Sequence, residues 1–162
     1  MSEAHALFQL GMDLDHGPGT AHREVTTGAH SSALVTGDHK DFFIERDGVR
    51  YAGTHLIIDL WDAEHLDDMG LVEAALQACV EASGATLLHM HLHHFTPNQG
   101  VSGVAVLAES HISVHTWPER GYAALDVFMC GDTNPHAAVQ VLRKAFCAKR
   151  VAVSEHLRGR AP

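Results

Sequence analysis

The stretch that decides the fold runs from Gly103 to Gly131 and reads GVAVLAESHISVHTWPERGYAALDVFMCG. Three segments within it, 103–109, 111–117 and 121–131, are rich in the β-branched and aromatic residues that strands prefer. Very short connections separate them, whereas parallel strands need a crossover of a dozen or more residues. The stretch therefore predicts an antiparallel meander.

Two helices flank this meander. The first is predicted at about 67–83, where Asp67 or Asp68 caps the N-terminus and Gly84 ends the helix. The second is predicted to run to about 148, with Asn134 as N-cap and Pro135 as its first residue.

Further strands are expected at 54–62, 86–95 and 151–157, and a hairpin around the Asp47-Gly48 pair. In the resulting order, both helices can cover one face of the sheet. The predicted fold class is α+β, a two-layer α/β sandwich with a mostly antiparallel sheet and its helices on one face.

Composition limits the possible organisation and partners. The chain has 162 residues, 46% of them apolar, which is enough for one domain with a real core. Residues 1–40 lack sustained periodicity and are expected to form a loosely ordered extension, with a single domain over 41–162. The net charge of −9 gives no support to nucleic-acid binding.

The expected location is the cytosol. Three cysteines, an odd number without paired spacing, argue for a reducing compartment. The N-terminus has no signal-peptide pattern, and no segment approaches the length of a membrane span. We therefore expect no membrane partner.

The segment TLLHMHLHHF, 86–95, raises the question of a metal site. It places Leu88, Met90 and Leu92 on one strand face and His89, His91 and His93 on the other, and His94 follows them. Imidazole is a good ligand for zinc, copper or nickel, but residues two apart on a strand lie roughly 6–7 Å apart. No CxxC or HExxH motif completes a ligand set, so a half-exposed sheet face is favoured and no metal is expected.

Ser110, in the sequence LAESHIS, has three possible interpretations from the residues alone. It can be a turn residue, a hydrolase nucleophile, or the point at which the chain cuts itself. The G-x-S-x-G elbow of a hydrolase nucleophile is missing, and the setting is strand–turn–strand.

The segment HHFTPNQGVSGVAVLAESHISVHTWPERGYAALDVFMCG, 93–131, favours the third interpretation. It closely resembles the bacterial S-adenosylmethionine decarboxylase proenzymes, which are pyruvoyl-dependent decarboxylases. Its most specific part is AESH, then HTWPE, then a cysteine before glycine. The resemblance extends from GTHLIIDL at 53 to VAVSEHLRG at 159.

The resemblance implies self-cleavage between Glu109 and Ser110 into chains 1–109 and 110–162, with Ser110 converted to a pyruvoyl group. It also implies that His115 is the base that promotes elimination and that Ser102 assists the acyl shift; both flank the junction in sequence. Cys130 matches the family's proton donor. Neither PLP nor a metal is implied, because the pyruvoyl group itself forms the Schiff base with the substrate amine.

The implied substrate is S-adenosylmethionine, and its decarboxylated form serves spermidine synthesis. Phe95 matches the ring that stacks on adenine and Glu119 the carboxylate that binds the ribose hydroxyls, while the backbone near the new Glu109 terminus contacts adenine. Tyr51 or Trp117 can supply a second aromatic wall. The resemblance also implies a homodimer or higher homo-oligomer.

Three other functions stay open. One is a related pyruvoyl decarboxylase acting on ornithine or arginine. Another is a non-catalytic paralogue that regulates an active partner, although Ser110, His115, Ser102 and Cys130 are all present. The last is a histidine-based metal-binding protein.

Overall fold

The computed structural model describes residues 43–96 and 99–160, which all belong to one compact unit of the chain. The predicted extension, residues 1–40, lies outside the described residues. In chain order the elements are β1 (Ile44–Arg46), β2 (Val49–Tyr51), β3 (Gly53–Trp61), α1 (Met69–Ser83), β4 (Leu87–His94), β5 (Val101–Leu107), β6 (Ser110–Trp117), the 3₁₀ turn η1 (Pro118–Arg120), β7 (Tyr122–Met129), α2 (His136–Ala145) and β8 (Arg150–Arg158).

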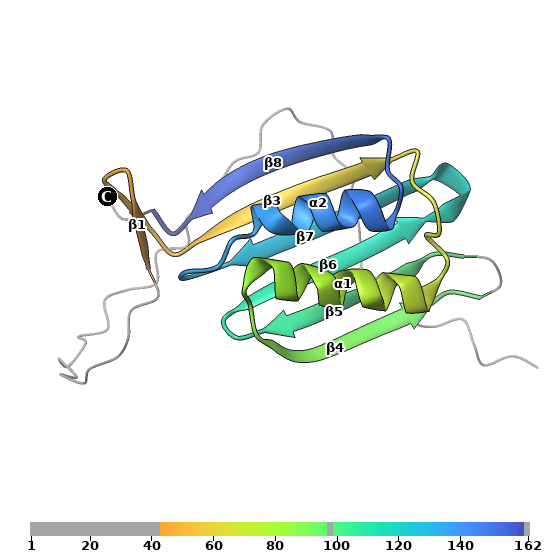
Figure 1. Ribbon diagram of the computed structural model, residues 1–162, viewed down its shortest axis with the longest axis horizontal. Helices are drawn as coiled ribbons and strands as arrows, with labels where there is room; N and C mark the ends of the chain where they lie inside the picture. The colour runs from red at the N-terminus through yellow and green to blue at the C-terminus, as the bar shows by residue number, and fades with distance from the viewer. Residues whose placement is uncertain (1–42, 97–98, 161–162) are drawn as a thin grey trace, which may run out of the picture. The chain divides into compact units, whose positions relative to one another are not determined.

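Six strands form one antiparallel sheet in the order β4-β5-β6-β7-β3-β8 (Figure 1). Strands β5, β6 and β7 are consecutive neighbours, which confirms the meander expected from residues 103–131. Helix α1 connects β3 to β4 across the intervening strands, and α2 connects β7 to β8 across β3. A separate short hairpin, β1-β2, precedes β3.

Both helices lie on the same face of the sheet, so the predicted α+β two-layer architecture is confirmed (Figure 1). Alternate residues of the central strands point into the layer between sheet and helices, for example Leu56, Ile58 and Leu60 of β3. Leu76 of α1 and Leu142 of α2 meet them there and are fully buried. Burial of such side chains stabilises the fold by roughly 1.5–3 kcal/mol each.

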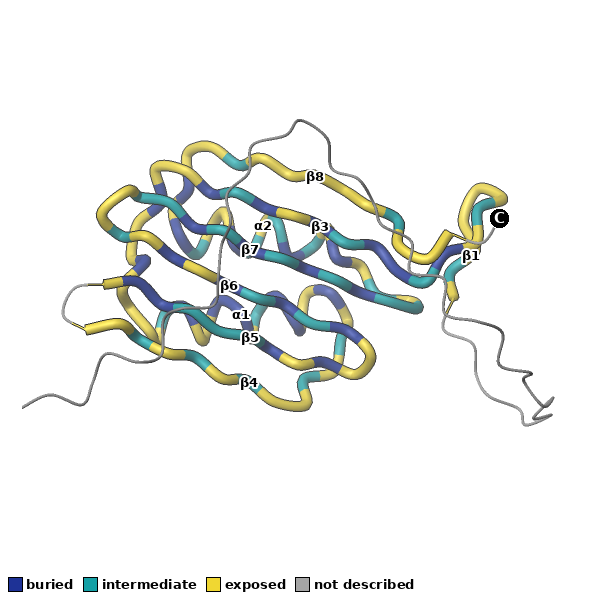
Figure 2. The backbone as a smooth tube through the Cα atoms, turned by 180° about the vertical axis from the view of Figure 1, so that it is seen from behind, coloured by how far each residue is buried: buried dark blue, intermediate teal, exposed yellow. Residues whose placement is uncertain are grey.

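Neither helix of the described residues covers the opposite face of the sheet. Seen from that side, the central strands alternate buried and more exposed residues (Figure 2). Several large apolar side chains on this face are exposed, among them Ile57, Trp61, Val106 and Trp117. We call this surface the open face.

Helix α1 is close to its prediction. Asp68 is the N-cap, and its carboxylate accepts a hydrogen bond from the Leu71 N–H (3.0 Å). Gly84 ends the helix in the left-handed conformation, with φ of 70°. Helix α2 differs at both ends, because it begins at His136 without a side-chain cap from Asn134 and ends at Ala145.

The prediction of which β4 side chains point to which face of the sheet is wrong at Leu88. A β-bulge between Leu87 and His89 places Leu87 opposite the buried Leu107 and leaves Leu88 64% exposed. A bulge adds a residue to one strand, so the alternation shifts by one position there. After the bulge, His91 and His93 lie on the open face as expected.

Candidate active site

The turn between β5 and β6 holds Glu109 in a strained conformation. Its φ is 60°, in the left-handed region that side chains other than glycine rarely adopt. Ser110, the next residue, is buried, and its Oγ accepts a hydrogen bond from the Cys130 N–H (3.2 Å). The strained peptide and an anchored hydroxyl therefore lie directly next to each other.

Cys130 follows the end of β7 beside this turn. Burial raises the pKa of its thiol, the Glu109 carboxylate raises it further, and the hydrogen bond with Ser110 acts in the opposite direction. A raised pKa keeps the thiol protonated at neutral pH, which suits an acid rather than a nucleophile. A cavity of about 440 Å³ opens here, and its lining includes Glu109, Cys130, Asp132 and Thr133.

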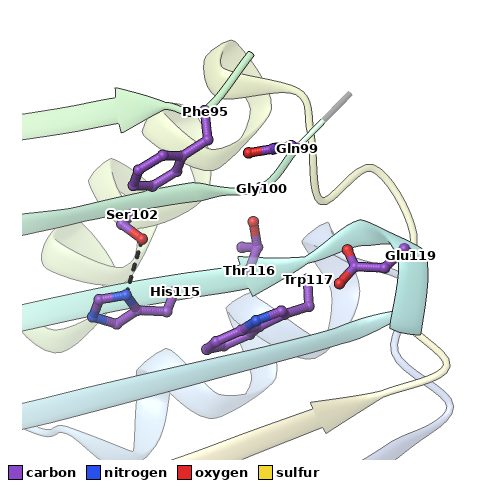
Figure 3. A pocket seen from close by; sticks show the side chains of 8 residues that line it. All are labelled: Phe95, Gln99, Gly100, Ser102, His115, Thr116, Trp117 and Glu119. Atoms are coloured by element: carbon purple, nitrogen blue, oxygen red, sulfur yellow. Dashed lines mark hydrogen bonds between the residues drawn. The ribbon is translucent and has the colours of Figure 1, made fainter. Parts of the chain in front are cut away.

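A second cavity, of about 470 Å³, lies at the other end of β6; we call it the aromatic pocket. Its lining residues are Phe95, Gln99, Gly100, Ser102, His115, Thr116, Trp117 and Glu119 (Figure 3). The rings of Phe95 and Trp117 lie on opposite sides of the pocket, and Glu119 lies at one end of it (Figure 3). A flat ring system with a hydroxyl-bearing substituent suits this arrangement.

Ser102 and His115 form a pair at the edge of this pocket. They are cross-strand partners on β5 and β6, and the Ser102 Oγ lies 2.9 Å from the His115 Nδ1 (Figure 3). Such a bond can hold the imidazole in one orientation. The structure therefore brings together four of the predicted site residues: Phe95, Ser102, His115 and Glu119.

Ser102 and His115 do not lie beside Ser110 within the chain. Ser110 and His115 are five residues apart on β6, about 17 Å at 3.3–3.4 Å per residue, and an odd separation puts their side chains on opposite faces. Proximity in sequence is thus misleading here, because an extended strand carries the two side chains apart.

The aromatic pocket has a supporting ring stack that sequence reasoning missed. Trp61, Tyr122 and Trp117 are in register on three neighbouring strands. Ring centroids lie 4.3 Å apart for Trp61–Tyr122 and 5.3 Å apart for Trp117–Tyr122. The Tyr122 hydroxyl donates to the Asp59 Oδ1 (2.6 Å), and this bond, followed by burial and the Asp59 charge, raises the pKa of Tyr122 to about 12.

Thr116 and Gly100 build the floor of the pocket and were also missed. The Thr116 Oγ1 accepts from the Val101 N–H (2.7 Å) and donates to the Leu66 carbonyl (2.6 Å). A Cβ at Gly100 would lie 1.8 Å from the Thr116 carbonyl oxygen, so only glycine is tolerated there. The glycine in QGVSG was the available signal for such a close approach.

A polar network occupies the open face between the two cavities. Asp126 accepts from the Ser113 hydroxyl (3.1 Å) and lies 3.2 Å from the His55 Nε2. Arg158 lies 3.1 Å from the other His55 nitrogen. Burial, and then His55, lowers the pKa of the neighbouring His111, while Asp126 acts to raise it.

Two residues that the sequence analysis considered lie elsewhere. Tyr51 is 2% exposed and lines neither cavity, so Trp117 is the second aromatic wall. The β4 histidines form no group of three donors close enough to share an ion within the described part of the chain. Neither helix described is long and apolar enough to cross a membrane.

Comparison with solved structures defines the class of this fold. The crystal structure of the adenosylmethionine decarboxylase from Aquifex aeolicus superposes with a TM-score of 0.64 at 32% identity. The match covers 69% of this chain and 94% of that one. The fold is thus that of a decarboxylase.

Sequence comparisons give the family. The family model for S-adenosylmethionine decarboxylase matches residues 54–159. The S-adenosylmethionine decarboxylase proenzyme of Thermomicrobium roseum is 48% identical over 108 residues, which are 66% of this chain and 93% of that protein. The proenzyme of Thermotoga maritima is 49% identical over 111 residues, 67% and 85% of the two chains. The chain belongs to the S-adenosylmethionine decarboxylase family, and the resemblance noted from its sequence is confirmed.

Proposed function

We propose that this protein is a self-processing decarboxylase that converts S-adenosylmethionine to its decarboxylated form and CO₂. The observation that carries the proposal is the Glu109–Ser110 turn, where a left-handed φ of 60° precedes a buried serine whose Oγ is anchored by Cys130. A strained peptide next to a held hydroxyl favours an acyl shift, because breaking the peptide releases the strain.

In the processing step, the Ser110 Oγ bonds to the Glu109 carbonyl carbon and the Glu109–Ser110 C–N bond breaks, so the peptide becomes an ester. Removal of the Ser110 α-proton then breaks the Cβ–Oγ bond and frees the Glu109 carboxylate. The remaining dehydroalanine takes up water and releases ammonia, which leaves a pyruvoyl group at position 110. The new carboxylate forms at Glu109, which is exposed, so its negative charge stays in contact with water.

The pyruvoyl group supplies a keto carbon for a Schiff base with the substrate amine and an electron sink for decarboxylation. The residues present suit this chemistry. The Cys130 thiol lies next to position 110 and stays protonated because its pKa is raised, so it can return a proton to the α-carbon. No lysine is required for this scheme.

The aromatic pocket supports the nucleoside substrate over ornithine or arginine. Phe95 and Trp117 offer two ring faces for adenine, and the Glu119 carboxylate can accept from paired ribose hydroxyls. A small amino acid would leave these groups without partners. Assaying CO₂ release from S-adenosylmethionine, ornithine and arginine in parallel, with mass identification of each product, separates the two substrate classes.

We further infer that two copies pair through the open face, so that each site combines the Ser110 turn of one copy with the aromatic pocket of the other. Two observations support this: the separation of about 17 Å between Ser110 and His115 along β6, and the exposed apolar residues Ile57, Trp61, Val106 and Trp117. A two-fold pairing makes both sites equivalent.

Intact mass of the untagged protein tests the processing proposal. We expect chains 1–109 and 110–162, the second starting with a pyruvoyl group, and a single uncut chain for Ser110→Ala. A Ser110→Ala protein that is cut and active would refute the mechanism, and an uncut native chain would favour the regulatory paralogue.

Co-expression tests the shared site. A His115→Ala chain keeps its own Ser110 but lacks the processing base, while a Ser110→Ala chain provides an intact His115. If the sites are shared, the His115→Ala chain is cut only when the Ser110→Ala chain is co-expressed. If the mixture stays uncut, each site is complete within one chain.

A further inference from the structure

We propose that Glu64, His65 and Cys147 form a binding site for a divalent transition-metal ion of the zinc type. One donor atom from each residue lies within 4.8 Å of the donors of the other two, the only such group among the described residues. None of the three lines the aromatic pocket or the cavity at the Ser110 turn. The site therefore lies outside both candidate cavities, and the proposal does not depend on the decarboxylation proposed above.

The three donors come from two segments far apart in the sequence. Glu64 and His65 lie in the connection between β3 and α1, and Cys147 lies just after α2. Backbone hydrogen bonds hold the segments together: the Glu64 N–H donates to the Phe146 carbonyl (2.7 Å), and the Lys149 N–H donates to the Trp61 carbonyl (3.2 Å). The fold thus fixes the backbone beneath all three side chains before any ion binds.

The chemistry of the donors selects the ion. A thiolate and an imidazole prefer zinc-type ions, whereas magnesium and calcium prefer sites made of oxygen alone. The thiolate and the Glu64 carboxylate together carry two negative charges, which balance a divalent cation. Three protein donors leave one tetrahedral position for water.

The donor spacing requires only a small contraction. Zinc bonds of about 2.0–2.3 Å place neighbouring tetrahedral donors about 3.3–3.8 Å apart. The His65 Nε2 already lies 4.0 Å from a Glu64 carboxylate oxygen. All three side chains are exposed, so rotamer changes can close the remaining gap without moving the core.

Two backbone features agree with a site that the fold holds in place. His65 and Cys147 both have a left-handed φ, 61° and 49°. Cys147 also follows the C-terminal end of α2, where the helix dipole is negative and favours a cation.

A bound ion would connect the end of α2 to the segment that supports the aromatic pocket. In that segment the Ala63 N–H donates to the Gly121 carbonyl (2.9 Å), directly after η1, which contains Glu119. Its Leu66 carbonyl accepts from Thr116 in the pocket floor. Metal binding should therefore stabilise the folded chain, since an ion that binds only the native state raises its stability.

The test uses the full-length chain without an affinity tag, first treated with a chelator and then titrated with Co²⁺ as a spectroscopic probe. A thiolate ligand gives a sulfur-to-cobalt charge-transfer band in the near ultraviolet. We expect the band to saturate at one equivalent of Co²⁺ and to be displaced by Zn²⁺. Cys147→Ser should abolish the band, and His65→Gln should weaken Zn²⁺ binding at least tenfold.

Matched controls separate this site from the many other histidines and from the other thiols. Replacing His89, His91 and His93 together by Gln removes three exposed imidazoles and should leave the band unchanged. Cys130→Ser should keep the band as well. Circular dichroism and thermal unfolding of the metal-free variants confirm that Cys147→Ser folds normally, as its exposed position predicts.

Added Zn²⁺ should raise the unfolding temperature of the native chain but not that of Cys147→Ser. The proposal is overturned if no charge-transfer band forms. It is equally overturned if the band survives Cys147→Ser, or if the triple histidine variant loses it.

Discussion

Replacing Thr116 by valine should destabilise the fold by about 2–6 kcal/mol, because two buried groups lose their partner. Valine nearly matches threonine in volume, so packing is preserved and only the hydroxyl is lost. That hydroxyl joins three segments, because it accepts from the Val101 N–H and donates to the Leu66 carbonyl. Val101 is 0% exposed and Leu66 1%, so water cannot replace the lost bonds. Each buried group left without a partner costs about 1–3 kcal/mol.

Urea unfolding measures the effect, in a Ser110→Ala background so that all variants are compared as single chains. Thr116→Ser is the matched control, because it keeps the hydroxyl and loses only a methyl group, worth about 0.8 kcal/mol. The slope of the unfolding free energy against urea concentration should be the same for all the proteins, because it follows the surface newly exposed on unfolding and the substitutions leave that surface unchanged. A loss below about 0.5 kcal/mol for Thr116→Val, or equal losses for both variants, would refute the reasoning.

Three further predictions concern the turn, the core and the pocket wall. Glu109→Gly should slow self-cleavage about tenfold, because removing the side chain relieves roughly 1–2 kcal/mol of strain in the left-handed backbone. Glu109→Gln keeps this strain and should be cut at the normal rate. A time course of cleavage followed on gels compares the two variants. Burial raises the pKa of Cys79 from 9.0 to about 12. The unfolded chain therefore loses this thiol proton first, so the stability that the protonated thiol contributes is full below pH 9 and is lost as pH rises toward 12. By pH 10.5 this loss is about 2 kcal/mol. The free energy of unfolding of Cys79→Ala should therefore fall less between pH 8 and pH 10.5 than that of the chain with Cys79. An equal fall in the two proteins would contradict this. Tyr122→Phe removes the hydrogen bond to Asp59 that holds the Tyr122 ring against Trp117. It should raise KM for S-adenosylmethionine about 3–10-fold with kcat little changed. An unaltered KM would show that Trp117 does not need the Tyr122–Asp59 bond to keep its position.

Much of the fold could be predicted from local patterns. Helix α1 carries its own signals, since Asp68 caps it and Gly84 ends it within one residue of the expected positions. The meander followed from connections too short for parallel strands. The prediction failed where local pattern was not enough: the bulge at Leu88 depends on how β4 pairs with β5, and no feature of TLLHMHLHHF shows it.

Some residues of the candidate site could be predicted from the sequence, and others could be found only in the structure. Ser110, Cys130, Ser102, His115, Phe95 and Glu119 were all named from the sequence, because the family motif contains them. Trp61, Tyr122 and Asp59 were not named, because their contacts exist only once β3, β7 and β6 are in register. The group of Glu64, His65 and Cys147 likewise joins residues more than 80 positions apart in the chain.

The sequence by itself determined the order of strands and helices, the family and the residues that carry the proposed chemistry, because these depend on neighbours within a few positions. Only the tertiary structure decided which of those residues meet. An extended β6 carries Ser110 and His115 about 17 Å apart and onto opposite faces, while strand pairing brings Ser102 to within 2.9 Å of His115. The physical reason is that distance along a strand grows with every residue, whereas hydrogen bonds between strands bring together residues that the sequence separates.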